Sequence, residues 1–280
     1  MPANLPYRGD GSGRPAGLAL PPARMPLLSG RRPLKRWTYC GVYGEELMLC
    51  AASVRIGGVP QAFWGLLERA GGRLSGVTKF TRGLVAVDDR RLSVHGRGIE
   101  IDLALTASGE PIEVVSSHGA SYIWTRKQPV HARGRVNVGG RVFDVDAAGL
   151  IDASAGYHAR VTQWQWSAGG GVASDGRAVC WNLVDGVHDS AVGSERTVWV
   201  DGVATEVGPV VFAPGLSGIG FAEDGASLAF TKEAERARRD NAGLVMSDYA
   251  QPFGTFAGSL PGGVTVERGF GVMERHDVRW

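Results

Sequence analysis

The sequence has few cysteines and no long apolar run. Its 280 residues include three cysteines, Cys40, Cys50 and Cys180, which form no C-x-x-C pair. An odd number without such spacing argues against a disulfide framework and against a cysteine-based zinc site, so we expect buried, reduced thiols. No apolar stretch approaches the roughly 20 residues that a membrane-spanning helix needs. We therefore expect no transmembrane segment.

The common catalytic signatures are absent as well. The sequence contains no G-x-S-x-G, no H-E-x-x-H, no phosphate-binding Walker loop and no G-x-G-x-x-G between a strand and a helix. The usual hydrolase, zinc-protease, nucleotide-binding and dinucleotide-binding motifs are thereby excluded. We expect no cofactor and no metal, and any catalytic site has to be assembled from several strands.

The charge balance gives little attraction to polyanions. A net charge of +2 provides no strong field toward nucleic acid, so we expect no nucleic-acid partner. A basic cluster of Arg31, Arg32, Lys35 and Arg36 follows a leader rich in Pro and Gly. We expect this cluster to be solvated surface, with weak contact to an anionic membrane surface as an alternative. The leader has no continuous apolar core of a secretory signal, which predicts a poorly ordered segment and a cytoplasmic protein.

Short apolar-alternating runs separated by turn signals predict an all-β fold. The turn signals are Asp88-Asp89, Ser108-Gly109, Gly139-Gly140, Asp175-Gly176, Asp201-Gly202 and Asp224-Gly225. Gly139-Gly140 lies between two alternating runs, Gly134–Val138 and Arg141–Val145, as a tight hairpin requires. Thr231–Asn241 is the one segment with helical composition, and it reads equally well as a charged edge strand.

A run of alternating polar and aromatic residues follows the hairpin. A strand over Tyr157–Ser167 would place one set of side chains on a single face: His158, Arg160, Thr162, Trp164 and Trp166. Aromatic walls around a few polar groups are typical of a binding pocket. The alternative is a bulge that leaves both tryptophans in the core and moves His158 and Arg160 to an exposed strand end.

The following segments supply further acid–base groups. If neighbouring strands pair in sequence order, Asn182, His188 and Glu195 converge with His158 at one mouth of a barrel, which would combine an imidazole with a carboxylate. Solvated loop residues are the alternative. The types of His158, His188 and Glu195 also suit a metal, but their spacing is not diagnostic of one.

The last strand is also polar. It places Glu274, His276 and Trp280 on one face and leaves no clean hydrophobic side. Such a strand is either an exposed edge protected by charge or the closing strand of a barrel with a polar interior. We count Glu274 and His276 as candidate ligand-binding residues.

Several long motifs resemble a known bacterial family. The segments YIWTRKQ, YHARVTQWQWSAG, WNLVDGVHD and GVMERHDVRW resemble proteins catalogued as domain of unknown function 2804, over nearly the whole chain from about Gly17. This family has no assigned activity. The resemblance therefore implies a fold more than a function.

A more distant resemblance connects the middle of the chain to the carotenoid 1,2-hydratase and AttH-like proteins. It rests on Gln128-Pro129, on the Gly134–Gly140 hairpin and on Asp152. The resemblance implies tandem lipocalin-like barrels and, in relatives that hydrate or cyclise polyenes, an acid beside cation-stabilising aromatic residues. Asp152 is most like that acid, although the Trp-Gly that often follows is here Ala-Gly-Tyr.

We therefore expect an all-β protein of two tandem lipocalin-like antiparallel barrels or strongly curved sheets. The predicted parts are a leader over 1–30, an N-terminal domain over 31–130 and a C-terminal domain over 131–280. The expected partner is a hydrophobic small molecule, lipid or isoprenoid-like, bound between or within the two halves. A scaffold at an anionic membrane surface is the third and weakest interpretation.

Two functions share this pocket. In an enzyme, the catalytic acid or base is Asp152, His158 or Glu195, with Arg160 and Asn182 orienting the substrate beside Trp164 and Trp166. In a carrier, the same groups and the ligand-binding His188, Glu274 and His276 only orient the ligand. A buried carboxylic acid with a raised pKa favours the enzyme, whereas a large, uniformly apolar cavity favours the carrier.

Overall fold

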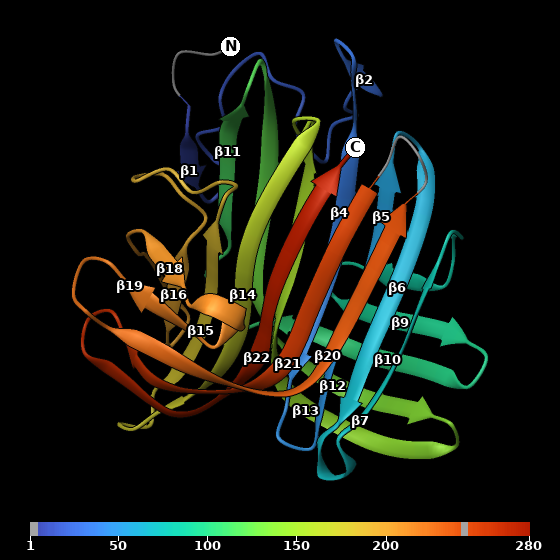
Figure 1. Cartoon of the computed structure of the whole chain (residues 1–280), viewed down its shortest axis with the longest axis vertical. Helices are drawn as coiled ribbons and strands as arrows, with labels where there is room; N and C mark the ends of the chain where they lie inside the picture. Colours follow the sequence, from blue (N-terminus) through green and yellow to red (C-terminus); the bar gives the residue numbers. More distant parts are fainter. Residues whose placement is uncertain (1–4, 242–245) are drawn as a thin grey trace.

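The chain folds into two strongly curved antiparallel β-sheets (Figure 1). The structure is a computed structural model that describes residues 5–241 and 246–280. Within those residues the helices are two short 3₁₀ turns, η1 at Arg69–Gly71 and η2 at Pro214–Leu216, and neither they nor anything else helical is long and apolar enough to cross a membrane. The predicted all-β fold with little helix is confirmed.

The first sheet is built from the N-terminal half of the chain. In spatial order its strands are β7 (Arg73–Lys79), β6 (Val59–Glu68), β5 (Leu47–Ile56), β4 (Lys35–Tyr43), β13 (Arg141–Gly156), β12 (Ser121–Val138), β10 (Ile99–Ala107), β9 (Arg91–Gly96) and β8 (Val85–Val87). β11 (Ile112–His118) pairs with the first part of β12, and β1 (Tyr7–Gly9) pairs with β11. A separate short ladder joins β2 (Leu28–Ser29) to β3 (Arg32–Pro33).

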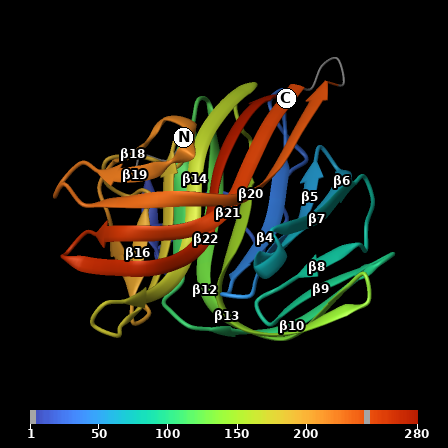
Figure 2. The ribbon, with the colours of Figure 1, turned by 60° about the horizontal axis from the view of Figure 1, so that its bottom comes forward.

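The second sheet is built from the C-terminal half. Its order is β17 (Val203–Glu206), β16 (Thr197–Val200), β15 (Ala178–Asp185), β14 (Val161–Ala173), β22 (Val264–Arg279), β21 (Met246–Leu260), β20 (Ser227–Asn241), β19 (Gly218–Phe221) and β18 (Val210–Phe212). In Figure 2 the short strands β18 and β19 lie far from β8 to β10, and the long strands of both sheets fill the space between.

Alternation of side chains explains how each sheet forms a core. In β10 the apolar Ile99, Ile101 and Leu103 are buried and the acidic residues between them are exposed, because successive strand residues point to opposite faces. The hairpin from β12 to β13 turns at Gly139-Gly140, where φ values of 58° and 83° favour glycine. The hairpin prediction is confirmed.

Four hydrophobic clusters result within the described residues, and three of them form the cores of the two sheets. One fills the concave side of the first sheet, around Leu49, Leu103 and Val136. One fills the second sheet, with residues such as Trp181 and Phe256. The third joins the sheets and includes side chains from both, among them Tyr39, Met48, Trp166, Phe253 and Val272. This shared core fixes β4 and β5 against β14, β21 and β22.

The leader does not have the poor order that we expected of it. From residue 5 onward it is packed: β1 extends the sheet beside β11, while Leu20 and Met25 are buried against Trp124 and Tyr157. The backbone pairing of β1 and this small apolar cluster hold the leader in place despite its high Pro and Gly content. Residues 1–4 lie outside the described residues.

The basic cluster that follows the leader is split. Arg31 and Arg36 are exposed, but Lys35 is 1% exposed and the Arg32 guanidinium donates to the carbonyl oxygen of His118. Strand alternation in β4 turns Lys35 inward. The expectation of a uniformly solvated cluster is therefore wrong for Lys35.

The segment Thr231–Asn241 belongs to β20. Of the two alternatives predicted for it, a helix or a charged edge strand, the strand is therefore correct. β19 pairs only with Ser227–Ala229, so from Thr231 onward β20 is paired on one side, with β21. Its alternating charged side chains suit this edge position.

The two sheets separate between β13 and β14, at residues 157–160. The predicted domain limit at residues 130 and 131 lies inside β12, a continuous strand of the first sheet. The Gly139-Gly140 hairpin, which the predicted limit assigned to the C-terminal domain, joins two neighbouring strands of the first sheet. How the halves divide as folding domains stays a prediction.

Candidate functional site

A cavity of about 560 Å³ lies between the two sheets. Its walls come from β4, β5, β6, β12 and β13 on one side and from β14, β15, β20, β21 and β22 on the other, together with the connection after β15 that carries His188 and Glu195. Aromatic side chains dominate these walls: Trp37, Tyr39, Phe63, Trp164, Trp166, Tyr249 and Trp280. Polar side chains enter this apolar space in three groups.

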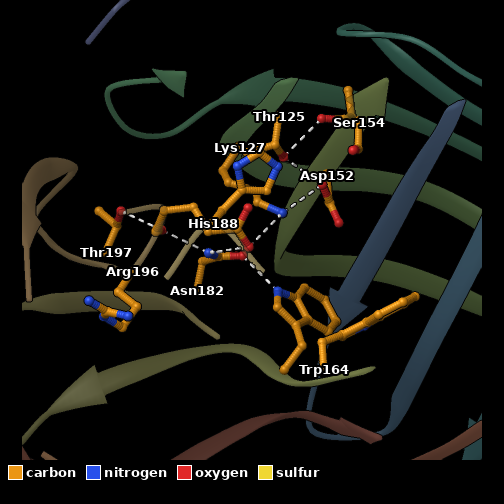
Figure 3. Close-up of polar contacts among 12 residues, drawn as sticks. Thr125, Lys127, Asp152, Ser154, Trp164, Asn182, His188, Arg196 and Thr197 are labelled. Carbon is orange, nitrogen blue, oxygen red and sulfur yellow. Dashed lines mark hydrogen bonds and ion pairs between the residues drawn. The ribbon is translucent and has the colours of Figure 1, made fainter. Parts of the chain in front are cut away.

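The first group is centred on Lys127, a buried residue of β12. Its Nζ lies 2.7 Å from Oδ1 of Asp152 and 3.2 Å from Oε1 of Glu195. Asp152 faces Lys127 directly because the two are register partners in the β12–β13 ladder. Figure 3 shows the ion pair between Lys127 and Asp152 as a dashed line.

Asn182 connects this group to the tryptophan wall. Its Nδ2 donates to the backbone oxygen of Glu195 at 2.9 Å, and its Oδ1 accepts a hydrogen bond from Nε1 of Trp166 at 2.8 Å. A buried amide with donor and acceptor both satisfied holds its neighbours in one arrangement. Asn182 therefore positions Glu195 and Trp166.

Burial and ion pairing act in opposite directions on these charges. Burial lowers the pKa of Lys127, but the charges of Asp152 and Glu195 outweigh it, so the net pKa is raised and the ammonium stays charged. Burial raises the pKa of Glu195, and Lys127 only partly offsets this. The group thus combines a permanent cation with a carboxyl group that accepts a proton more readily than usual.

The second group surrounds Glu274 on β22. Its Oε1 accepts a hydrogen bond from Nε1 of Trp164 at 2.8 Å, and its Oε2 accepts from the Tyr249 hydroxyl at 2.9 Å and from Nε2 of Gln251 at 3.1 Å. Burial raises the pKa of Glu274 to about 7 although Trp164 and Tyr249 favour the ionised form. A carboxyl group in this range exchanges its proton near neutral pH.

The third group contains histidines. His188 lies 2.7 Å, through Nδ1, from Oγ of Ser116. The His158 ring packs between Trp37 and Trp280, with ring centroids 5.4 Å and 6.3 Å away, and next to His118 at 5.7 Å. Burial lowers the pKa of His158 to about 3 and that of His188 well below its usual value, so both rings are neutral near pH 7.

Most of the predicted site residues lie at this cavity. Its lining includes Asp152, His158, Trp164, Trp166, His188, Glu195, Glu274 and His276. Asn182 is one layer behind, bonded to two of them. His276 is held by Ser247, whose Oγ lies 2.8 Å from its Nε2. The functional roles that we predicted for these residues stay predictions.

Arg160 is the exception. The chain leaves the sheet after Gly156 and β14 starts only at Val161, so the predicted unbroken strand over Tyr157–Ser167 is wrong. Arg160 is exposed and lies outside the cavity lining. The irregular stretch nevertheless buries His158 at the cavity, as the pocket interpretation of this segment predicted, although no unbroken strand carries it there.

Sequence reasoning missed several residues of the site. Lys127 carried a signal, since it is one of only four lysines and comes shortly after the aromatic residues Tyr122 and Trp124. Trp37 and Tyr39 sit at alternate positions of β4, and Tyr249 and Gln251 at alternate positions of β21. Without pairing partners, nothing in these strands distinguished a cavity wall from an ordinary core.

Within the described residues, no group of three or more His, Cys, Asp or Glu side chains is placed to hold a metal ion. The donors present are mostly paired with each other or with aromatic N–H and O–H groups.

Fold and cavity together define an all-β protein whose two curved sheets enclose a shared, aromatic-walled pocket. The same fold occurs in an AttH-like protein from Nitrosomonas europaea, with a TM-score of 0.54 and 16% identity over 93% of this chain and 97% of that one. It also occurs in the kievitone hydratase from Nectria haematococca, with a TM-score of 0.53 and 10% identity over 86% of this chain and 88% of that one.

The chain belongs to the family described as domain of unknown function (DUF2804), whose family model matches residues 77–280. No curated protein matches the chain at a significant level. Both resemblances inferred from the sequence motifs are thus confirmed, one by the family and the other by the fold.

Proposed function

We propose that this protein is an enzyme that transfers a proton to or from a hydrophobic small molecule held between its two sheets. The observation that carries the proposal is the Glu274 carboxyl group, which lines an aromatic pocket and has a pKa raised by burial to about 7. A carrier needs no such group, whereas a general acid or base works best when its pKa lies near the working pH.

The surrounding residues take complementary roles. Glu274 donates or removes the proton, and Tyr249 and Gln251 hold its carboxyl group by hydrogen bonds. Glu195, whose pKa is also raised, is the second carboxyl group, kept in place by Lys127 and Asn182. The faces of Trp164 and Trp166 stabilise positive charge that develops on an apolar substrate.

Addition or loss of water is the first reaction to test. Two carboxyl groups with raised pKa allow one to protonate a double bond while the other activates water. The fold likeness to a kievitone hydratase supports this choice within the wider set of hydration, isomerisation and cyclisation.

A non-catalytic hydrophobe carrier is the second candidate. The mainly apolar wall, with aromatic rings from both sheets, favours it. Carrier and enzyme differ in one measurable respect, which is whether the bound molecule exchanges a hydrogen with solvent.

The test uses lipids extracted from the host. The protein is incubated with this extract in heavy water, and ligands that it retains are compared by mass spectrometry before and after incubation. We expect a retained compound to gain deuterium at carbon or one molecule of water. Glu274→Gln should slow this gain by about 10²- to 10⁴-fold, the usual contribution of a general acid or base.

The matched control is Glu100→Gln, because Glu100 is an exposed carboxylate of β10 far from the cavity lining. It should react as the wild type does. Retention of a ligand without any mass change in the wild type would favour the carrier. Equal rates in the wild type and in Glu274→Gln would remove Glu274 from the reaction.

A further inference from the structure

One end of the cavity carries polar groups that the proposed proton transfer does not use. His158 and His188 both line the cavity and are 2% and 6% exposed. Within the described residues, Nδ1 of His158 and Nε2 of His188 have no hydrogen-bond partner. Buried polar atoms are nearly always bonded, so two such atoms at one cavity point to a ligand group that bonds them.

A buried cation lies behind these rings. Nζ of Lys35 is 3.4 Å from the backbone oxygen of His158 and 4.7 Å from the centroid of the Trp280 ring. Over residues 5–241 and 246–280, Lys35 has no carboxylate within ion-pair distance. Burial and the nearby charge of Arg32 lower its pKa to about 8, which leaves it mostly charged at neutral pH.

This arrangement differs from that of the other buried lysine. Lys127 is neutralised by Asp152 and Glu195. Among the described residues, Lys35 instead faces a carbonyl oxygen and an aromatic ring, with no carboxylate in ion-pair distance, and a buried charge without a counter-ion is costly. An anionic group brought by the ligand would supply the missing counter-charge and accept hydrogen bonds from the two imidazoles.

We propose that the ligand of this cavity is an amphipathic carboxylic acid. Its carboxylate binds at the end lined by His158 and His188, with Lys35 next to His158 behind that lining, and its apolar body extends along the aromatic walls toward Glu274. This inference rests on the proposed function only in assuming that the cavity binds a small molecule. It adds the chemical class of that molecule and the direction in which it lies.

A carboxylate fits this end better than a phosphate. Lys35 supplies one positive charge, and the two buried imidazoles are neutral donors with one N–H group each. One cation and two neutral donors match a monoanion with two oxygens. A phosphate monoester near neutral pH carries up to two charges and would leave one of them uncompensated.

The test compares three ligands with the same chain: dodecanoate, dodecanol and dodecyl phosphate. Each displaces the neutral probe Nile red from the full-length protein, followed by fluorescence at neutral pH. We expect dodecanoate to bind at least about tenfold more tightly than dodecanol, because its carboxylate gains charge-assisted hydrogen bonds. Lys35→Met and His158→Phe should each abolish this preference by weakening the binding of dodecanoate.

Lys232→Met is the control, since Lys232 is an exposed lysine on β20, and it should keep the preference. Thermal unfolding followed by circular dichroism establishes that each variant is folded. Equal binding of dodecanoate and dodecanol by the wild type would overturn the inference, as would tighter binding of dodecyl phosphate. Failure of Nile red itself to bind would instead remove the pocket on which the proposed function depends.

Discussion

The replacement of Glu274 by glutamine tests the electrostatics of the pocket without knowledge of the substrate. Burial moves the pKa of this carboxyl group from 4.5 to about 7 in the folded protein. Because the folded pKa is raised, the associated stability is fully present below about pH 4.5 and is lost as the pH rises through 7. Ionising the group inside the fold therefore costs on the order of 3 kcal/mol of unfolding free energy.

Glutamine has nearly the same shape and cannot ionise. Glu274→Gln should be the less stable protein at acidic pH, because the amide cannot accept all the hydrogen bonds from Trp164, Tyr249 and Gln251. Between pH 4.5 and about 8 the wild type should lose on the order of 3 kcal/mol relative to the variant. The difference in unfolding free energy between the wild type and Glu274→Gln should thus fall to zero or change sign.

The assay is urea unfolding followed by tryptophan fluorescence at a series of pH values. Taking the difference between wild type and variant removes the contributions of Glu195 and of the buried histidines, which titrate in both proteins. The exposed Glu100→Gln should show no pH-dependent difference from wild type. A wild-type-minus-Glu274→Gln difference that stays constant with pH would refute the burial argument.

Two further predictions concern stability. Lys127→Met should lower the unfolding free energy, measured by urea titration, by about 3–5 kcal/mol, because Asp152 and Glu195 lose their shared cation. The control is Lys232→Met, at an exposed lysine, which should change the unfolding free energy by less than about 0.5 kcal/mol. Equal effects of the two substitutions would contradict a buried ion-pair role for Lys127. Gly169→Ala should cost about 1–3 kcal/mol, since its methyl group would overlap the Trp181 ring and lie 2.6 Å from the Phe270 oxygen. Gly220→Ala, with nothing within 4 Å, is the matched control, and a similar loss there would show that packing is not the cause.

The sequence predicts the fold class well because the relevant signals are local. Alternation along Ile99–Ala107 and the paired glycines at 139 and 140 each define a strand or turn from neighbouring residues alone. The point at which the chain passes from the first sheet to the second was harder to predict from the sequence. It lies in the four residues between Gly156 and Val161, where no proline or acidic turn marks the change.

The site was predictable in part for the same reason. Trp164, Trp166 and Glu274 alternate with residues of the opposite face, and alternation correctly gives their direction. The burial of Lys127 and Lys35 was not predictable, because a lysine in a strand is ordinarily solvated; the rarity of lysine draws attention to Lys127 but does not place it. The enclosure of Lys127 follows only from the pairing of β12 with β13, and that of Lys35 only from its position against the Trp280 ring.

The two walls of the pocket have one further consequence. Cys50 and Gln251, which bond at 3.2 Å within the shared core, are 201 residues apart in sequence. During synthesis the first sheet is complete long before β21 and β22 exist, so its share of the aromatic wall remains uncovered until the last strands arrive. On the proposed function, the pocket can bind its ligand only once these last strands are in place, and a ligand bound between the sheets then raises the stability of the folded protein.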